Sequence, residues 1–180
     1  MPWEDVPELK GAELIFDADA IEQAYDRIAA QITSQYSDKR PLILSVMIGG
    51  IIPAGQIVPR LDFPLEMDYL HATRYRNETR GGDLVWHALP TSSFEDRDII
   101  VIDDILDEGF TLVGIIDALK AGGARSVATA VLVNKIHERK HEGISADFFG
   151  VEAPDRYLFG AGMDCKGLGR NAPGIYAIDV

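Results

Sequence analysis

The chain has 180 residues, 47% of them hydrophobic and 26% charged, which is typical of one globular domain that buries a core of its own. Its formal net charge of −12 argues against nucleic acid or an anionic membrane as the main partner, because both attract basic surfaces. A single cysteine excludes an intramolecular disulfide and a four-cysteine zinc site, and no apolar run approaches the roughly 20 residues that span a bilayer.

The chain starts with an acidic segment, residues 1–5, that lacks the apolar core of a signal peptide, so we expect a cytoplasmic protein. Residues 19–34 predict a helix, because apolar side chains recur there at three- and four-residue spacing. Asp19 with Glu22 matches the pattern of a capping box, which predicts that this helix begins at Asp19.

Residues 42–48 form a short apolar run that ends at Gly49 and Gly50, which indicates a buried strand entering a tight turn. Pro53 then suits the first turn of a helix. Residues 63–69 predict the next strand. The polar, glycine-ended residues 74–82 predict a mobile loop.

Further strands are predicted at residues 84–86, 99–102 and 127–133, with a helix over residues 112–119 that stops at two glycines. From residue 148 onward, short apolar pieces alternate with glycines and no period is evident. Strands alternating with amphipathic helices predict an α/β fold with a mainly parallel twisted sheet flanked by helices. Ligands bind beyond the carboxyl ends of such strands, where the glycine turn and the segment after residue 102 should meet.

The most informative segment is residues 99–111, with the sequence IIVIDDILDEGFT. Asp103 and Asp104 are expected to close the strand, where they could accept hydrogen bonds from hydroxyls or reach a hard cation through water. Residues 107–111 offer successive backbone amides, a glycine and a hydroxyl at a helix start, which suits a phosphate. The plainer alternative is a capped helix with solvated acids, which accounts less well for four acids directly after a buried strand.

Residues 101–111 resemble the phosphoribosyl-diphosphate signature of the type I phosphoribosyltransferases, in which an apolar strand and paired acids precede Asp-x-Gly-x-Thr. The order of a glycine turn, a loop, this signature and a lysine after the next strand also agrees. Residues 154–164 resemble the purine-binding segment of the 6-oxopurine (hypoxanthine-guanine) members. The resemblance implies a single phosphoribosyltransferase domain over residues 1–180, with a small hood from about residues 1–40 and 150–180.

The resemblance also implies roles for individual residues. Asp107 would be the general base that takes a proton from the purine. Ribose, phosphate and diphosphate would be held by Asp103, Asp104, Glu108, Gly109, Phe110, Thr111, Ile48, Gly49 and Arg170. The lid would carry Arg74 and Tyr75, and the purine would meet Lys135 at its 6-oxo group, the ring of Tyr157 and the main chain of Leu158. Asp164 would hold Mg²⁺, with Asp103 and Asp104 acting through water.

The activity so implied is Mg²⁺-dependent transfer of a phosphoribosyl group from phosphoribosyl diphosphate to hypoxanthine or guanine in purine salvage, by a homodimer or homotetramer. Two alternatives stay open: a regulator of the same fold that senses phosphoribosyl diphosphate, and a transferase for another base, xanthine or a pyrimidine. Glu108 stands where the family usually carries threonine, so its side chain should turn away from the phosphate. The four histidines (His71, His87, His137 and His141) have no partners at a suggestive spacing and are expected to have no catalytic role.

Overall fold

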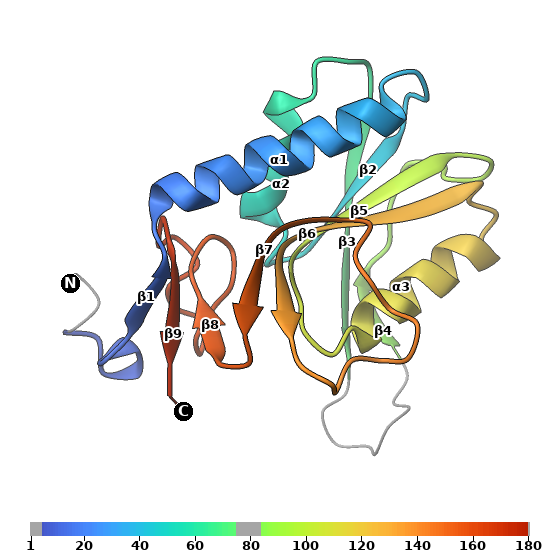
Figure 1. The fold of residues 1–180 in the computed structure, drawn as a ribbon. Coiled ribbons are helices and arrows are strands. Elements are labelled where there is room, and N and C mark those ends of the chain that lie inside the picture. Colours follow the sequence, from blue (N-terminus) through green and yellow to red (C-terminus); the bar gives the residue numbers. More distant parts are fainter. Residues whose placement is uncertain (1–4, 75–83, 180) are drawn as a thin grey trace.

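The computed structural model describes residues 5–74 and 84–179, which form an α/β fold (Figure 1). In these residues the larger sheet has the strand order β4-β3-β2-β5-β6-β7, and its neighbours are parallel except for β3 and β4. The strands are β2 (Leu42–Val46), β3 (Glu66–Arg74), β4 (Leu84–Ala88), β5 (Asp98–Leu106), β6 (Ser126–Ile136) and β7 (Phe148–Pro154). The predicted fold class, a mainly parallel sheet flanked by helices, is confirmed.

Helices cover both faces of this sheet. α1 (Ala18–Tyr36) and α2 (Ile51–Ile57), the latter followed by the 3-10 turn η2 (Val58–Arg60), lie on one face, and α3 (Phe110–Ala121) lies on the other (Figure 1). Ile100 and Ile102 pack into the core on the α1 side, whereas Ile99 and Val101 pack into the core on the α3 side. Because both faces are buried, residues 99–102 of β5 form a continuous apolar run without a polar side.

The N-cap of helix α1 lies two residues earlier than the capping box predicted. Asp17 is the N-cap residue, and its Oδ1 accepts a hydrogen bond from the main-chain N–H of Ala20 at 2.9 Å. The prediction that Asp19 caps the helix is therefore wrong, because Asp19 already lies in the first turn. Asp17 and Asp19 both stand near the positive end of the helix dipole, so the sequence pattern alone suits either residue.

Strand β5 also differs from its expected end, because it runs through Asp103 and Asp104 to Leu106. The prediction that the paired acids close the strand is wrong. β6 is long enough to keep pairing with β5, with Ile105 opposite Val133 and Leu106 opposite Asn134. The two carboxylates are consequently held by a strand rather than by a loop.

A second, smaller sheet has the order β1-β9-β8 and is antiparallel. It combines β1 (Glu13–Phe16), which follows the 3-10 turn η1 (Pro7–Leu9), with β8 (Tyr157–Phe159) and β9 (Ile175–Ile178). Figure 1 shows this sheet beside both chain ends and separate from the larger one. Its strands are residues 13–16, 157–159 and 175–178, whereas α1 packs on β7 of the larger sheet, and the expected hood stays a prediction.

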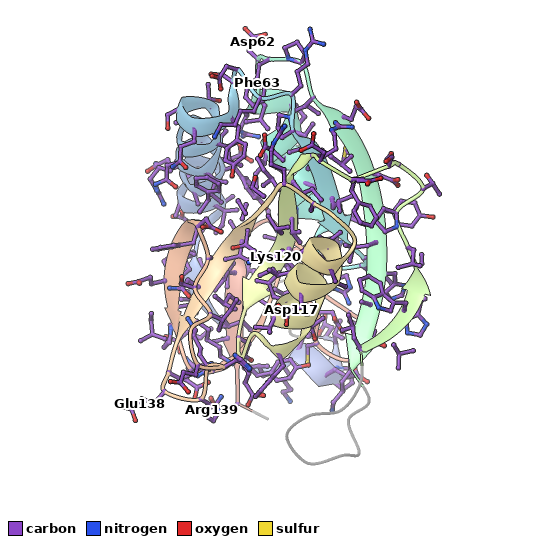
Figure 2. All side chains as sticks on the ribbon, turned by 90° about the vertical axis from the view of Figure 1, so that its right-hand side faces the viewer. Asp62, Phe63, Asp117, Lys120, Glu138 and Arg139 are labelled. Atoms are coloured by element: carbon purple, nitrogen blue, oxygen red, sulfur yellow. The ribbon has the colours of Figure 1, made fainter. Side chains whose placement is uncertain are left out.

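The chain order creates a crevice between β2 and β5. From β2 the chain moves outward to β3 and β4, then returns to β5 on the other side of β2. Such a switch point leaves an opening at the carboxyl ends of the two strands. Figure 2 shows the two ends of the molecule: Glu138 and Arg139 follow β6 at the carboxyl end, and Asp62 and Phe63 precede β3 at the opposite end. In the described parts of the chain, no helix has the length and apolarity needed to cross a membrane.

We expect Asp17→Ala to lower the free energy of unfolding by about 1 kcal/mol, because the N–H of Ala20 loses its acceptor. Asp19→Ala is the matched control and should cost only a few tenths of a kcal/mol through the helix dipole. Urea denaturation followed by circular dichroism measures both changes. A larger loss in the Asp19 variant would contradict the observed cap.

Candidate active site

A cavity of about 590 Å³ lies at the carboxyl ends of β2, β3 and β5. It is lined by residues 46–49, 71–73, 103–112, Asp164 and Arg170. One cavity therefore contains the glycine turn and the acidic segment, as the sequence predicted. It also contains Asp164 and Arg170 from the C-terminal part of the chain.

Asp103 and Asp104 stand side by side in β5, and the main-chain N–H of Asp104 donates to Asp103 Oδ1 at 2.8 Å. Burial raises the pKa of both carboxyls, and the neighbouring charge of Asp104 raises the pKa of Asp103 further. Two carboxyls held this close in a sheltered place favour a ligand that brings positive charge or hydroxyl donors.

Gly49 lies directly against this pair. A Cβ on Gly49 would stand 2.0 Å from Asp104 Oδ2, so no other residue fits here without moving the carboxylate. Gly162, with φ of +114°, closes the same place, because its Cβ would stand 2.5 Å from the carbonyl oxygen of Gly49. The Met47–Ile48 peptide bond is cis, and the Ile48 side chain is half exposed at the cavity.

Arg170 connects the acids of β5 with the C-terminal part of the chain. Its Nη1 donates to the carbonyl oxygen of Gly162 at 2.7 Å and lies 3.8 Å from Asp104 Oδ2, and its Nη2 forms an ion pair with Asp164. The N–H of Gly167 donates to the other oxygen of Asp164 at 2.7 Å. The residues predicted for diphosphate and for metal thus meet in one place.

The donor atoms at this place are of the type that Mg²⁺ takes, and their distance from one another suits contacts made partly through water. Asp103, Asp104 and Asp164 supply carboxylate oxygens, the ligand type that this hard cation takes, and an open cavity leaves room for water and substrate oxygens. The raised pKa of the buried pair gives an independent reason, since a cation would offset the repulsion between the two carboxylates.

Beyond β5 the main chain turns into α3 through Gly109, whose φ of +82° is left-handed. A Cβ there would come within 2.9 Å of the side chains of Ile144 and Leu106. Helix α3 begins at the next residue, Phe110, so main-chain N–H groups of its first turn, including that of Thr111, lie at the cavity. This is the geometry that suits a phosphate.

The Glu108 side chain has a cationic neighbour. Its Oε1 lies 3.5 Å from Nε of Arg139, and its carbonyl oxygen accepts a hydrogen bond from the N–H of His141 at 2.8 Å. The ion pair offsets a charge that would otherwise oppose a phosphate. Participation of the Glu108 amide in phosphate binding stays a prediction.

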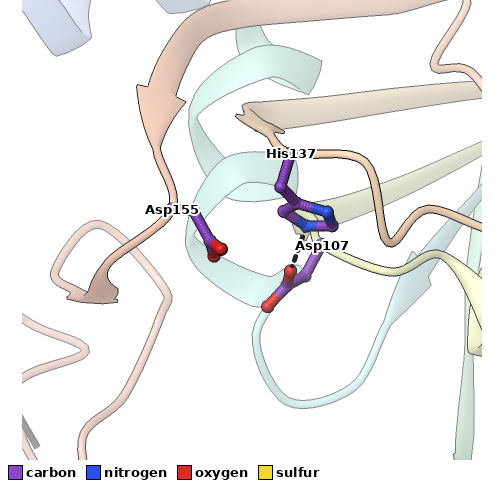
Figure 3. A group of neighbouring side chains, drawn as sticks. All are labelled: Asp107, His137 and Asp155. Atoms are coloured by element: carbon purple, nitrogen blue, oxygen red, sulfur yellow. Dashed lines mark hydrogen bonds and ion pairs between the residues drawn. The ribbon is translucent and has the colours of Figure 1, made fainter.

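Asp107 is the centre of a charged network (Figure 3). Its Oδ2 accepts a hydrogen bond from Lys135 Nζ at 3.0 Å, and its Oδ1 lies 2.6 Å from His137 Nε2. Lys135 Nζ also lies 3.3 Å from Asp155, which forms an ion pair with Arg139. Arg139 and, to a lesser degree, Lys135 hold the pKa of Asp155 well below its usual range.

A second cavity, of about 230 Å³, shares Asp107 with the first. It is lined by Asp104, Ile105, Asp107, Lys135, Tyr157, Leu158, Met163 and Asp164. Tyr157 is 41% exposed, whereas Leu158 is buried. The three residues predicted to meet a purine therefore line one small cavity.

The predicted lid falls at the edge of the described residues. Arg74 ends β3, and Tyr75 lies outside the residues that the structure describes. Their roles in a lid stay predictions.

The contact of His137 with Asp107 was missed by the sequence reasoning, which expected no catalytic role for any histidine. His137 follows β6 directly and stands two residues after Lys135. Side chains two residues apart in an extended chain point to the same side, so this spacing was a signal that could have placed His137 beside the lysine. The structure brings both against Asp107.

Comparison with known proteins agrees with this geometry. Residues 11–166 match the family model of the phosphoribosyl transferase domain. The chain is 32% identical to the hypoxanthine-guanine phosphoribosyltransferase of Bacillus subtilis (strain 168) over 164 residues. These residues cover 91% of each protein. It is 28% identical over 162 residues to the hypoxanthine-guanine-xanthine phosphoribosyltransferase of Tritrichomonas foetus, covering 90% of this chain and 88% of that one.

A solved structure is similar over the same length. A hypoxanthine phosphoribosyltransferase from Staphylococcus aureus superposes with a TM-score of 0.87 at 27% identity, covering 93% of this chain and 91% of the other. Fold, site geometry and sequence similarity thus agree, and the chain belongs to the phosphoribosyltransferase family.

Proposed function

We propose that the protein transfers the 5-phosphoribosyl group from phosphoribosyl diphosphate to a 6-oxopurine and releases diphosphate. A ring nitrogen of the base bonds to C1 of the ribose, the bond from C1 to the diphosphate oxygen breaks, and the proton of the ring nitrogen passes to Asp107. The names of the relatives from B. subtilis and T. foetus support a purine as the acceptor.

The position of Asp107 on the lining of both cavities carries this proposal. The larger cavity joins the paired acids to the first turn of α3, and the smaller one joins Lys135 to Tyr157 and Leu158. Asp107 lines both, and its side chain is 44% exposed, so a reacting group in either cavity can reach it. A general base needs this placement before any adjustment of its pKa.

The lining of the smaller cavity suits a purine base. Tyr157 offers an aromatic ring for stacking, and Lys135 offers N–H donors to an oxo group. The 6-amino group of adenine is itself a donor and would face the N–H donors of Lys135, which disfavours adenine.

The larger cavity supplies the charge arrangement that the reaction needs. The ribose becomes cationic in the transition state, and the nearby carboxylates of Asp103 and Asp104 stabilise that charge. Arg170 is placed to meet the leaving diphosphate, and the N–H groups that begin α3 hold the 5-phosphate. Mg²⁺, when bound through Asp103, Asp104 and Asp164, supplies neutralising charge to the diphosphate.

The expected homodimer or homotetramer stays a prediction.

Incubation with phosphoribosyl diphosphate, Mg²⁺ and each nucleobase in turn should give nucleotide with hypoxanthine, guanine or both. Asp107→Ala should lower kcat at least about 100-fold, because general bases contribute about 10²- to 10⁴-fold. Asp117→Ala is the matched control, because Asp117 is an exposed residue of α3 (Figure 2) and should leave kcat unchanged. Binding of phosphoribosyl diphosphate without turnover of any base would instead support a sensing protein, and turnover of a pyrimidine alone would replace the purine.

Lys135→Gln should lower kcat/KM for 6-oxopurines about 10- to 100-fold relative to that for adenine, because a hydrogen bond to a charged donor contributes about 1.5–3 kcal/mol. The ratio of the two kcat/KM values is the relevant measurement, since Lys135 also contacts Asp107 and its loss affects every base. An unchanged ratio would show that Lys135 does not read the 6-position.

Removal of divalent cations with a chelator should reduce turnover to background. Added Mg²⁺ should restore turnover in proportion to the concentration of its complex with phosphoribosyl diphosphate. The reason is that Arg170 alone carries the neutralising charge among the described residues lining the larger cavity. Full turnover in the presence of the chelator would rule out the metal.

A further inference from the structure

We propose that His137 is a positioning residue for Asp107: its imidazole donates a hydrogen bond from Nε2 to Asp107 Oδ1 and holds the carboxylate in the orientation that accepts the proton of the base. This inference rests on the proposed function, in which Asp107 is the general base. Figure 3 shows the two side chains facing each other, joined by the contact of 2.6 Å.

The direction of this hydrogen bond follows from the second ring nitrogen. Nδ1 of His137 accepts a hydrogen bond from the main-chain N–H of Arg139 at 3.1 Å. A nitrogen that accepts cannot carry the proton, so in this arrangement the proton is on Nε2. Nε2 is therefore the donor to Asp107, and the turn at residues 137–139 selects the tautomer.

The imidazole is held in a rigid and sheltered place. The His137 side chain is only 4% exposed, against 44% for Asp107, so the histidine lies behind the carboxylate and away from solvent. It directly follows β6, whose last residues pair with β7 through Ile136 opposite Pro154. A donor anchored in this way restricts rotation of the carboxylate.

The two anchors of Asp107 act on different oxygens. Lys135 donates to Oδ2 and His137 to Oδ1, which fixes the plane of the carboxylate. Each carboxylate oxygen has two acceptor sites, so one donor on each still leaves room for the incoming proton. When Lys135 donates to the oxo group of a bound base, its hydrogen bond to Asp107 Oδ2 is weakened. The hydrogen bond from His137 to Oδ1 is then the one that still holds the carboxylate.

The same side chains do not make a convincing metal site. Ligand atoms of Asp107, His137 and Asp155 lie within 4.8 Å of one another. However, the ammonium group of Lys135 lies 3.0 Å from Asp107 and 3.3 Å from Asp155 and already supplies the positive charge. The cluster is therefore an ion-pair network in which the histidine acts on the carboxylate.

His137→Leu and His137→Gln distinguish this role from mere packing. Leucine has no donor, whereas the glutamine amide can place an N–H near the position of Nε2. We expect His137→Leu to lower kcat about tenfold with KM for phosphoribosyl diphosphate changed less than about twofold, since a hydrogen bond to a charged group contributes about 1.5 kcal/mol or more. His137→Gln should recover most of kcat. Glu138→Leu, at the exposed neighbouring position (Figure 2), is the matched control and should leave both values unchanged.

The outcomes separate the two proposals. Wild-type protein without turnover on any base contradicts the proposed function. Active wild type with an unimpaired leucine variant, or with glutamine and leucine variants equally impaired, overturns the role of His137. The tautomer is tested without relying on the folding of a variant: ¹⁵N-histidine NMR of the wild type should show His137 with its proton on Nε2, and a proton on Nδ1 would overturn the inference.

Discussion

The contact of Gly49 with the Asp104 carboxylate is the constraint on which the rest of the site depends. β2 and β5 pair in parallel, with Ser45 opposite Ile102, and their ends must then part to leave an opening. Only a residue without a side chain lets the turn after β2 come this close to the acids on β5. Gly162 then approaches the same turn from the C-terminal part of the chain. Three distant segments thereby meet around one pair of carboxylates.

The proposed function requires a protein of net charge −12 to receive a highly anionic substrate. Among the described residues, three cations of the site are matched by acids: Arg170 by Asp164, Arg139 by Asp155, and Lys135 by Asp107 and Asp155. A phosphate ligand that binds these cations must therefore replace the carboxylates that pair with them, because the cations do not carry unpaired charge. The attraction is local, made by oriented donors, and does not need a basic surface.

The sequence predicted the fold class and most elements because two signals were strong. Continuous apolar runs such as residues 99–102 indicate strands buried on both faces, and the spacing in α1 is helical. The course of β5 beyond Asp103 was not predictable from that strand alone, since it depends on the length of its partner β6. The last thirty residues were not predictable for a similar reason: β8 and β9 are short, and β9 pairs with β1 from the other end of the chain. The contact of His137 was missed because its partner, Asp107, is thirty residues away in sequence.

The small sheet has a consequence for the order in which the two cavities form during folding. Tyr157 and Leu158 belong to β8, which pairs with β9, and β9 pairs in turn with β1. Contacts so distant in sequence form late in folding, because much of the chain must be ordered first. The acidic strand, the glycine turn and the start of α3 are closer together in sequence and belong to the larger sheet. By this reasoning a folding chain assembles much of the larger cavity before the smaller one is complete, so that under the proposed function base specificity is the last property the molecule acquires.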